Sequence, residues 1–158
     1  MTSELIDLVK GWVVAHEVTT AYATSAEGRD ALARAGVRVD APGDADAEKR
    51  DMVLTELGAA GGAEVTRLAA LASKLVVVVA DNARRPFHPG LIMEVGPLVW
   101  SIGRVRDRVP YDMPEKMNGL KSLVPARLLR RLVRREAWVV DVTPRTPQAR
   151  RKLLRTVP

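Results

Sequence analysis

Residues 52–81, MVLTELGAAGGAEVTRLAALASKLVVVVAD, decide the fold class of this chain, because they can be interpreted in two ways. In the α/β interpretation, MVLTEL is a strand, GAAGG a turn, AEVTRLAALASK a helix and LVVVV a buried parallel strand that ends at Asp81. That strand end is where ligand-binding residues gather in such folds. GAAGG, however, has neither the glycine spacing of a dinucleotide fingerprint nor the Gly-Lys-Ser/Thr of a P-loop.

The helical interpretation of the same stretch rests on periodicity. Apolar residues recur at spacings of three, four, three and four at Val65, Leu68, Ala72, Leu75 and Val79. The pattern passes through the valine cluster and stops before Pro86. Because periodicity over fifteen residues outweighs β-propensity over four, we favour the helix.

The flanking segments also predict helices. One apolar stripe covers residues 5–20, and Thr24 with Glu27 has the spacing of a capping box that opens a second helix. A further amphipathic pattern covers residues 92–102, and AWVVDV at 137–142 is expected to be a strand. We therefore expect a helix-dominated α+β fold with one or a few short strands. The alternative is an α/β fold with a βαβ unit at the stretch quoted above.

The charges of the chain are distributed unevenly. Residues 101–158 carry fifteen Lys and Arg against five Asp and Glu, whereas residues 1–100 carry ten against fourteen. A basic segment of this density is typical of proteins that bind a polyanion or dock on an acidic protein surface.

The prolines that follow the amphipathic pattern at residues 92–102 suggest a boundary. Pro110 and Pro114 bracket an irregular link. We expect residues 1–109 to form a neutral to acidic helical body, and residues 110–158 to form a basic helix–strand–helix segment that packs on it, within one compact domain.

The clearest amphipathic pattern is PARLLRRLVRRE at residues 125–136. On a helix, its four apolar Leu and Val residues fall within one arc of about 140°, and its arginines fall within the opposite arc. The arginines are Arg127, Arg130, Arg131, Arg134 and Arg135. Like charges at these spacings repel one another, so the face predicts an anionic partner that offsets the cost.

A second basic helix is expected at the end of the chain. Thr146 and Pro147 suit its cap and first turn, and its basic residues are Arg150, Arg151, Lys152 and Arg155. The order of basic helix, strand, Thr-Pro and basic helix is similar to the C-terminal part of winged-helix DNA-binding domains of the MarR type, although no first wing strand precedes it. The likeness and the scarcity of aromatic residues favour phosphate contacts to a DNA duplex over single-strand binding.

The sequence predicts no metal site. Asp44, Asp46 and Glu48 alternate as at the start of a calcium-binding loop. Lys49 stands where that loop requires glycine, and Thr55 stands where it requires a bidentate carboxylate. We expect a solvated acidic turn, and no cofactor.

These patterns predict a nucleic-acid-binding protein, with DNA as the expected target, that is not an enzyme. One alternative is an assembly or adaptor subunit of a larger complex, including viral ones, which docks its basic face on an acidic partner or forms a homo-oligomer. A second alternative is a small α/β enzyme, for which Asp81, His88 and Glu94 are the candidate residues.

The composition limits the compartment only loosely. There is no cysteine, and the longest stretches without a charged residue, 18–26 and 95–103, are too short for a membrane span. The start of the chain is acidic where a secretory signal would be basic. We expect a cytoplasmic protein, or a component of a virion or other assembly if the adaptor alternative holds.

Overall fold

The computed structural model describes residues 3–40, 48–57, 61–81, 90–111, 123, 125 and 135–142. In chain order its elements are α1 (Ser3–Ala15), β1 (Thr20–Ala23), α2 (Ala26–Arg34), β2 (Arg38–Asp40), β3 (Arg50–Leu57), α3 (Gly61–Ala69), β4 (Ala72–Asp81), α4 (Gly90–Ile102), β5 (Gly103–Tyr111) and β6 (Arg135–Val142). Helices and strands alternate along most of this order, which is the signature of an α/β fold.

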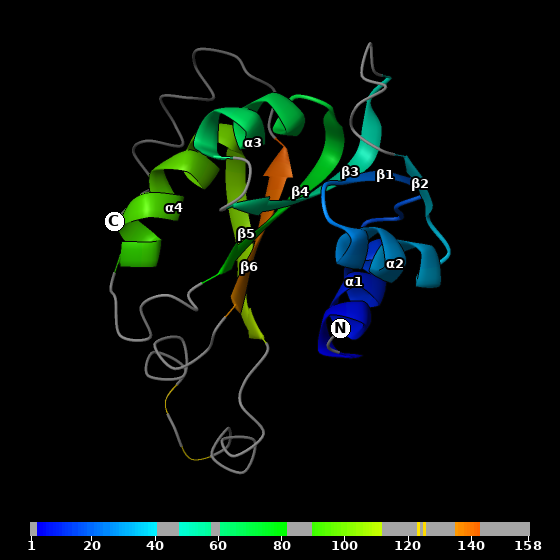
Figure 1. The fold of residues 1–158 in the computed structure, drawn as a ribbon, viewed down its shortest axis with the longest axis horizontal. Helices are drawn as coiled ribbons and strands as arrows, with labels where there is room; N and C mark the ends of the chain where they lie inside the picture. The colour runs from blue at the N-terminus through cyan, green and yellow to red at the C-terminus, as the bar shows by residue number, and fades with distance from the viewer. Residues whose placement is uncertain are drawn as a thin grey trace.

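The six strands form one mixed sheet in the order β2-β1-β3-β4-β6-β5 (Figure 1). The first four strands of the chain run parallel to one another. β6 enters between β4 and β5 and runs antiparallel to both. The last described strand, β6, is therefore internal to the sheet, while β5 forms its edge.

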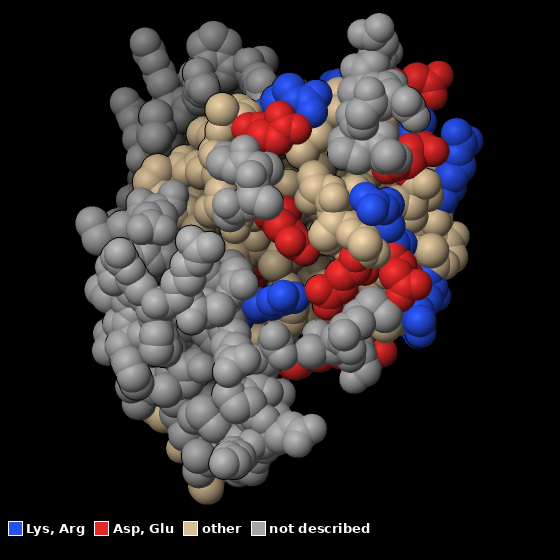
Figure 2. Space-filling model, in the orientation of Figure 1, with Lys and Arg blue, Asp and Glu red and all other residues tan. Residues whose placement is uncertain are grey.

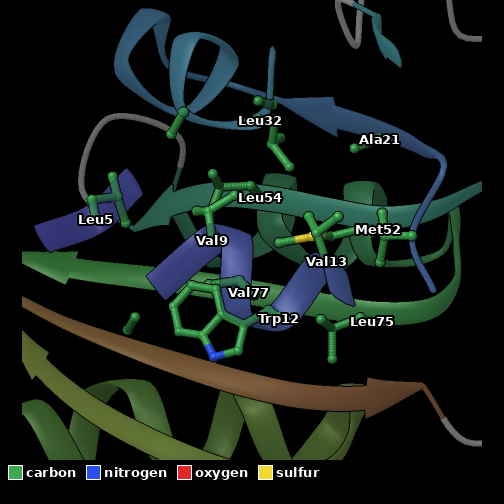
Figure 3. Packing of buried hydrophobic residues seen from close by; sticks show 14 of the residues in the cluster. Leu5, Val9, Trp12, Val13, Ala21, Leu32, Met52, Leu54, Leu75 and Val77 are labelled. Carbon is green, nitrogen blue, oxygen red and sulfur yellow. The ribbon is translucent and has the colours of Figure 1, made fainter. Parts of the chain in front are cut away.

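Helices α1 and α2 cover one face of the sheet. Figure 3 shows Leu5, Val9 and Trp12 of α1 lying over the side chains of β3 and β4, among them Leu54 and Val77. All five side chains are buried. The apolar face of α1, whose residues recur every three or four positions, thus packs on the alternate residues of the strands. Each apolar side chain removed from water contributes on the order of 1.5–3 kcal/mol to folding.

Helices α3 and α4 cover the opposite face (Figure 1). Val65 of α3 and Val99 of α4 pack in one cluster with Val76 and Val78 of β4 and Trp138 of β6. The side chains of β4 alternate between the two clusters, so this strand is buried on both faces. A strand covered on both sides reads in sequence as a continuous apolar run.

The prediction of a helix through residues 65–79 is therefore wrong, and with it the helix-dominated α+β fold. α3 ends at Ala69, and the valine run belongs to β4. The helical spacing continued through that run only because every position in it is apolar, so any period fits. The α/β alternative, with a βαβ unit at residues 52–81, matches β3, α3 and β4.

Other predicted elements are found with changed ends. α1 ends at Ala15, and α2 begins after Ser25 rather than Thr24. α4 covers the pattern at 92–102 in one helix, with Pro97 inside it. The predicted strand at 137–142 lies within β6. The division into residues 1–109 and 110–158 stays a prediction, and the expected link begins inside β5, which continues to Tyr111.

The predicted basic helix at residues 125–136 is contradicted at its end, where Arg135 and Glu136 are the first residues of β6. Its other arginines, and all basic residues of the predicted last helix, lie outside the described residues. Among the helices that the structure describes, none is long and apolar enough to cross a membrane.

Candidate active site at the carboxyl edge of the sheet

The direction of strand addition reverses at β1. The chain passes from β1 through α2 to β2 on one side, and then returns to place β3 and β4 on the other side. The carboxyl ends of these four parallel strands lie at Ala23, Asp40, Leu57 and Asp81. In open α/β sheets, ligands bind outside the carboxyl ends at such a switch point.

The turn from β1 to α2 is short and closed by its own side chains. The Ser25 hydroxyl caps α2 by accepting from the Gly28 backbone N–H at 3.0 Å. The Thr24 hydroxyl accepts from the Glu56 backbone N–H at 3.2 Å, and the Thr24 N–H donates to the Leu54 carbonyl at 3.1 Å. These bonds hold the start of α2 on the end of β3.

Gly28 permits this close approach. A Cβ at this position would lie 2.9 Å from Cδ2 of Leu54. Ala23, Ser25 and Gly28 have the spacing of a dinucleotide-binding fingerprint, of which the third glycine allows a helix to pack tightly on a strand and the second lets a pyrophosphate approach the backbone. Only the packing glycine is present here. This glycine, three residues after a hydroxyl cap, is the signal that could have located the site in the sequence.

An acidic residue ends β2, next to β1. Arg50 donates a hydrogen bond from Nε to Oδ2 of Asp40 at 2.9 Å, and its Nη2 forms an ion pair with the same oxygen at 2.9 Å. The Arg50 guanidinium lies 5.2 Å from the centre of the Tyr22 ring. Arg38 contacts Oδ2 of Asp40 at 3.8 Å. Every contact of Asp40 within the described part of the chain uses Oδ2. Oδ1 thus makes no hydrogen bond or ion pair with a described residue, and the side chain is 30% exposed.

A second group of polar side chains lies on the α1/α2 face at the same edge. Arg135, at the start of β6, forms an ion pair of 3.0 Å with Glu27 in the first turn of α2. Tyr111, opposite Arg135 on β5, is fully buried. Burial raises the pKa of the Tyr111 phenol well above its usual value; Arg135 opposes that rise, while Glu27 and Glu56 add to it. These four residues, which we call the edge cluster, thus come from α2, β3, β5 and β6.

A buried ion pair lies on the α3/α4 face of the last two strands. Arg108 of β5 donates from Nη2 to Oε2 of Glu136 at 2.8 Å, and Glu136 is only 1% exposed. The Arg108 guanidinium also stacks 4.3 Å from the centre of the Trp138 ring. Thr55 is buried on β3, two strands away from Trp138 across β4, and its hydroxyl has no hydrogen-bond partner.

The residues predicted from the sequence as functional are distributed differently. Arg135 pairs with Glu27 instead of projecting from a basic helix. Asp81 ends β4, as the α/β interpretation expected, and Glu94 lies in α4. His88 lies outside the described residues. The residues that sequence reasoning missed as a site are Glu27, Asp40, Glu56 and Tyr111.

The described surface does not show a separate basic face. Figure 2 shows Lys and Arg side chains interspersed with Asp and Glu on the visible side of the described residues. Several of these charges are paired, for example Arg34 with Asp30 and Arg67 with Glu64. Among the described residues there is no group of three or more side chains suited to hold a metal ion.

Comparisons with known proteins give a fold and no family. No family model matches the chain, and no curated protein matches it in sequence. Magnesium protoporphyrin IX methyltransferase from Synechocystis PCC 6803, solved with bound SAH, is similar in structure, with a TM-score of 0.50 and 11% identity over 89% of this chain and 83% of that one. An O-methyltransferase from Bacillus cereus in complex with SAH has a TM-score of 0.49 and 11% identity over 90% and 82%.

This likeness overturns four predictions made from the sequence. The fold is a Rossmann-like sheet with helices on both faces, as in the SAH-bound methyltransferase, and is not dominated by helices. The predictions of a DNA-binding or adaptor protein, of a protein that is not an enzyme, and of a helical character are contradicted with it. The physical reason is visible at Arg135 and Glu136, which belong to an internal strand and not to an exposed recognition helix.

Proposed function

We propose that this chain is a small α/β enzyme that binds a nucleoside cofactor of the S-adenosyl type and transfers a methyl group. The proposal is supported by the switch point at β1 and by the fold shared with an SAH-bound methyltransferase. The observation that carries it is the chemistry of the α2 N-terminus, which disfavours a phosphate and is compatible with an uncharged nucleoside.

Phosphates bind helix N-termini through free backbone N–H groups and the positive end of the helix dipole. Here the Ser25 hydroxyl already accepts from the Gly28 N–H, and the Glu27 carboxylate lies in the first turn. A phosphate would compete with the Ser25 hydroxyl for the Gly28 N–H, and it would be repelled by the Glu27 carboxylate. Ser25 also stands where a dinucleotide site needs its second glycine. The turn therefore argues against a dinucleotide cofactor and is compatible with a cofactor that has no phosphate groups.

The fit of an adenosyl cofactor to these residues is best at Asp40. A ribose carries two adjacent hydroxyl donors, and an acidic residue at the end of the strand after β1 accepts them in dinucleotide-binding folds. Oδ1 of Asp40 makes no hydrogen bond or ion pair with a described residue, while Arg50 holds the carboxylate through Oδ2. Asp40 would hold the ribose, and the Thr24–Ser25 turn would border the cofactor on the side of β1.

When bound, S-adenosylmethionine supplies a methyl group on a positively charged sulfur, which makes the group transferable to a nucleophile. The work left to this chain is to orient the acceptor and to keep water out. Glu56 is the penultimate residue of β3, beside the switch point. Its carboxylate is half-buried and makes no hydrogen bond or ion pair to any described residue. It is the side chain placed to accept a proton or hydrogen bond from an acceptor.

Calorimetric titration of the protein with SAH tests the cofactor proposal. We expect saturable binding that weakens about 10- to 100-fold in Asp40→Asn, because a charged hydrogen-bond acceptor contributes about 1.5–3 kcal/mol. Asp30→Asn is the matched control, since Asp30 makes a comparable ion pair on the exposed side of α2. Binding of NAD but not SAH, or equal loss in both variants, would contradict the proposal.

A further inference from the structure

The carboxylate of Asp40 is held by an arginine that reaches it across a neighbouring strand. Asp40 ends β2 and Arg50 begins β3, and β1 lies between these two strands in the sheet. Tyr22 of β1 stands beside Asp40 in the β1–β2 ladder. The Arg50 guanidinium lies over the Tyr22 ring, 5.2 Å from its centre. The side chain of Arg50 therefore crosses β1 above Tyr22 to reach the end of β2.

The surroundings of Arg50 restrict the orientation of its guanidinium. Nη1 of Arg50 donates to Oε2 of Glu48 at 3.1 Å. The Tyr22 ring below it is buried, and the Tyr22 hydroxyl donates to the Glu48 carbonyl at 3.1 Å. The Arg50 side chain is only 13% exposed. A planar guanidinium that stacks on a fixed ring and donates on two sides has little freedom to turn.

Both nitrogens that Arg50 directs at Asp40 meet the same oxygen. Nε donates to Oδ2 at 2.9 Å, and Nη2 forms its ion pair with Oδ2 at 2.9 Å. The bidentate pairing of an arginine with a carboxylate instead engages both carboxylate oxygens through two parallel hydrogen bonds. Two nitrogens on Oδ2 fix the direction of the Asp40 carboxylate and leave Oδ1 without a hydrogen bond or ion pair to a described residue. Arg50 thus orients Asp40 through one of its two oxygens.

We propose that Arg50 is a positioning residue of the cofactor site, which directs Oδ1 of Asp40 toward a ribose hydroxyl. The inference rests on the cofactor function proposed above. A carboxylate that is already oriented loses less conformational entropy when it accepts the hydroxyl. Arg50 does not contact the cofactor in this assignment, so its whole effect on ribose binding passes through Asp40.

Two neighbouring charges provide matched controls. Arg38 contacts Oδ2 of Asp40 at 3.8 Å, beyond hydrogen-bond distance, and its side chain is 71% exposed. Arg38→Gln therefore removes a positive charge beside Asp40 but keeps the Arg50 hydrogen bond. Glu48 is the other carboxylate on Arg50, and its side chain is 85% exposed. Glu48→Gln removes that second ion pair but keeps the contacts between Arg50 and Asp40.

The test compares adenosine with 2′,3′-dideoxyadenosine, which lacks both ribose hydroxyls, in ligand-observed NMR titrations. The ratio of the two affinities measures what the hydroxyls contribute to binding within one protein. We expect Arg50→Gln to lower this ratio about 2- to 10-fold, the range that corresponds to immobilising one side chain. Arg50→Lys keeps the charge but has no planar fork, so it should lower the ratio in the same direction. Neither control variant should change the ratio.

A purely structural role of Arg50 would weaken the binding of both nucleosides equally, so an unchanged ratio in Arg50→Gln overturns the inference. An equal decrease in Arg38→Gln also overturns it, because charge alone would then explain the effect. In an Asp40→Asn background, Arg50→Gln should not lower the ratio further. A further decrease there would show that Arg50 does not act through Asp40. Circular dichroism checks the fold of each variant, and Arg50→Lys decides the question if Arg50→Gln does not fold.

Calorimetry with SAH on the unchanged protein distinguishes failure of this inference from failure of the cofactor proposal. If SAH binds and the nucleoside ratio is the same with and without Arg50, the cofactor proposal stands and the positioning role of Arg50 is wrong. If neither SAH nor adenosine binds the unchanged protein, the cofactor proposal is wrong, and the inference is overturned with it.

Discussion

Gly28 decides how closely α2 can approach the sheet at the switch point. A Cβ at this position would meet Leu54 Cδ2 at 2.9 Å and the Ser25 hydroxyl at 3.1 Å. Either Leu54 changes its rotamer within the core, or α2 moves away from β3 and the Thr24 and Ser25 bonds lengthen. The capping interaction and the packing of the turn are therefore linked through this one residue.

We expect Gly28→Ala to lower the free energy of unfolding by about 1–3 kcal/mol, the usual cost of overpacking a core site. Urea denaturation followed by circular dichroism measures it. Gly11→Ala is the control: Gly11 is exposed within α1 and a Cβ there would meet nothing within 4 Å. That change should raise the stability by about 0.5–1 kcal/mol. A stabilising effect at Gly28 would show that the turn has free space.

The choice of cap at α2 illustrates what single residues reveal in the sequence. Thr24 and Ser25 both carry a hydroxyl suited to a helix N-cap, and Thr24 has a glutamate three residues later. The sequence thus favoured Thr24. In the fold, the Thr24 hydroxyl accepts from Glu56 of β3, thirty-two residues away, and Ser25 caps the helix. Residues so far apart in the chain leave no local sequence pattern from which this hydrogen bond could be predicted.

At the scale of elements, β5 and β6 are joined by the Arg108–Glu136 ion pair in addition to their ladder of backbone hydrogen bonds. Glu136 is almost completely buried and Arg108 is largely covered, with its guanidinium on the Trp138 ring. Removing one partner of such a pair leaves the other charge buried and uncompensated, whereas replacing both with apolar groups restores a neutral core.

We predict that Arg108→Ala destabilises the protein by about 3–5 kcal/mol in chemical denaturation. The double variant Arg108→Met, Glu136→Leu should recover most of this loss, because it removes both charges and retains apolar volume. A double-mutant cycle completed with Arg108→Met alone and Glu136→Leu alone measures the coupling. Additive effects of the two single changes would mean that the ion pair does not contribute to the β5–β6 pairing.

β4 shows why element type was ambiguous from sequence. Its central four valines have high β-propensity, but the residues before them continue a helical spacing from α3. The break at Ala70 and Leu71 contains neither glycine nor proline, so no local signal marks it. What separates helix from strand is the pairing of Val76 with β3 on one side and β6 on the other.

For the whole molecule, this topology predicts which strand has the highest free energy of local unfolding. β4 is paired on both edges, and its side chains are buried on both faces. We expect the amide protons of Leu75–Val79 to exchange only through global unfolding, and those of β2, a three-residue edge strand, to exchange much faster. Hydrogen exchange monitored by NMR tests this order. Equal protection from exchange in β4 and β2 would contradict the expectation that the centre of the sheet is its most stable part.

The sequence by itself determined the local features: the apolar face of α1, the hydroxyl-capped start of α2, the Pro97-containing helix and the strand at the end of the described chain. It also contained both interpretations of residues 52–81 without selecting one. Periodicity and propensity act over a few residues, and the two disagreed there.

Only the tertiary structure decided which strands pair, and through them the candidate site. Asp40, Glu56, Tyr111 and Arg135 are separated by up to 95 positions in sequence. They lie along the same end of one sheet because the strands that carry them pair with one another. The physical reason is that burial of β4 on both faces stabilises the parallel sheet, and this gain depends on partners that no sequence window contains.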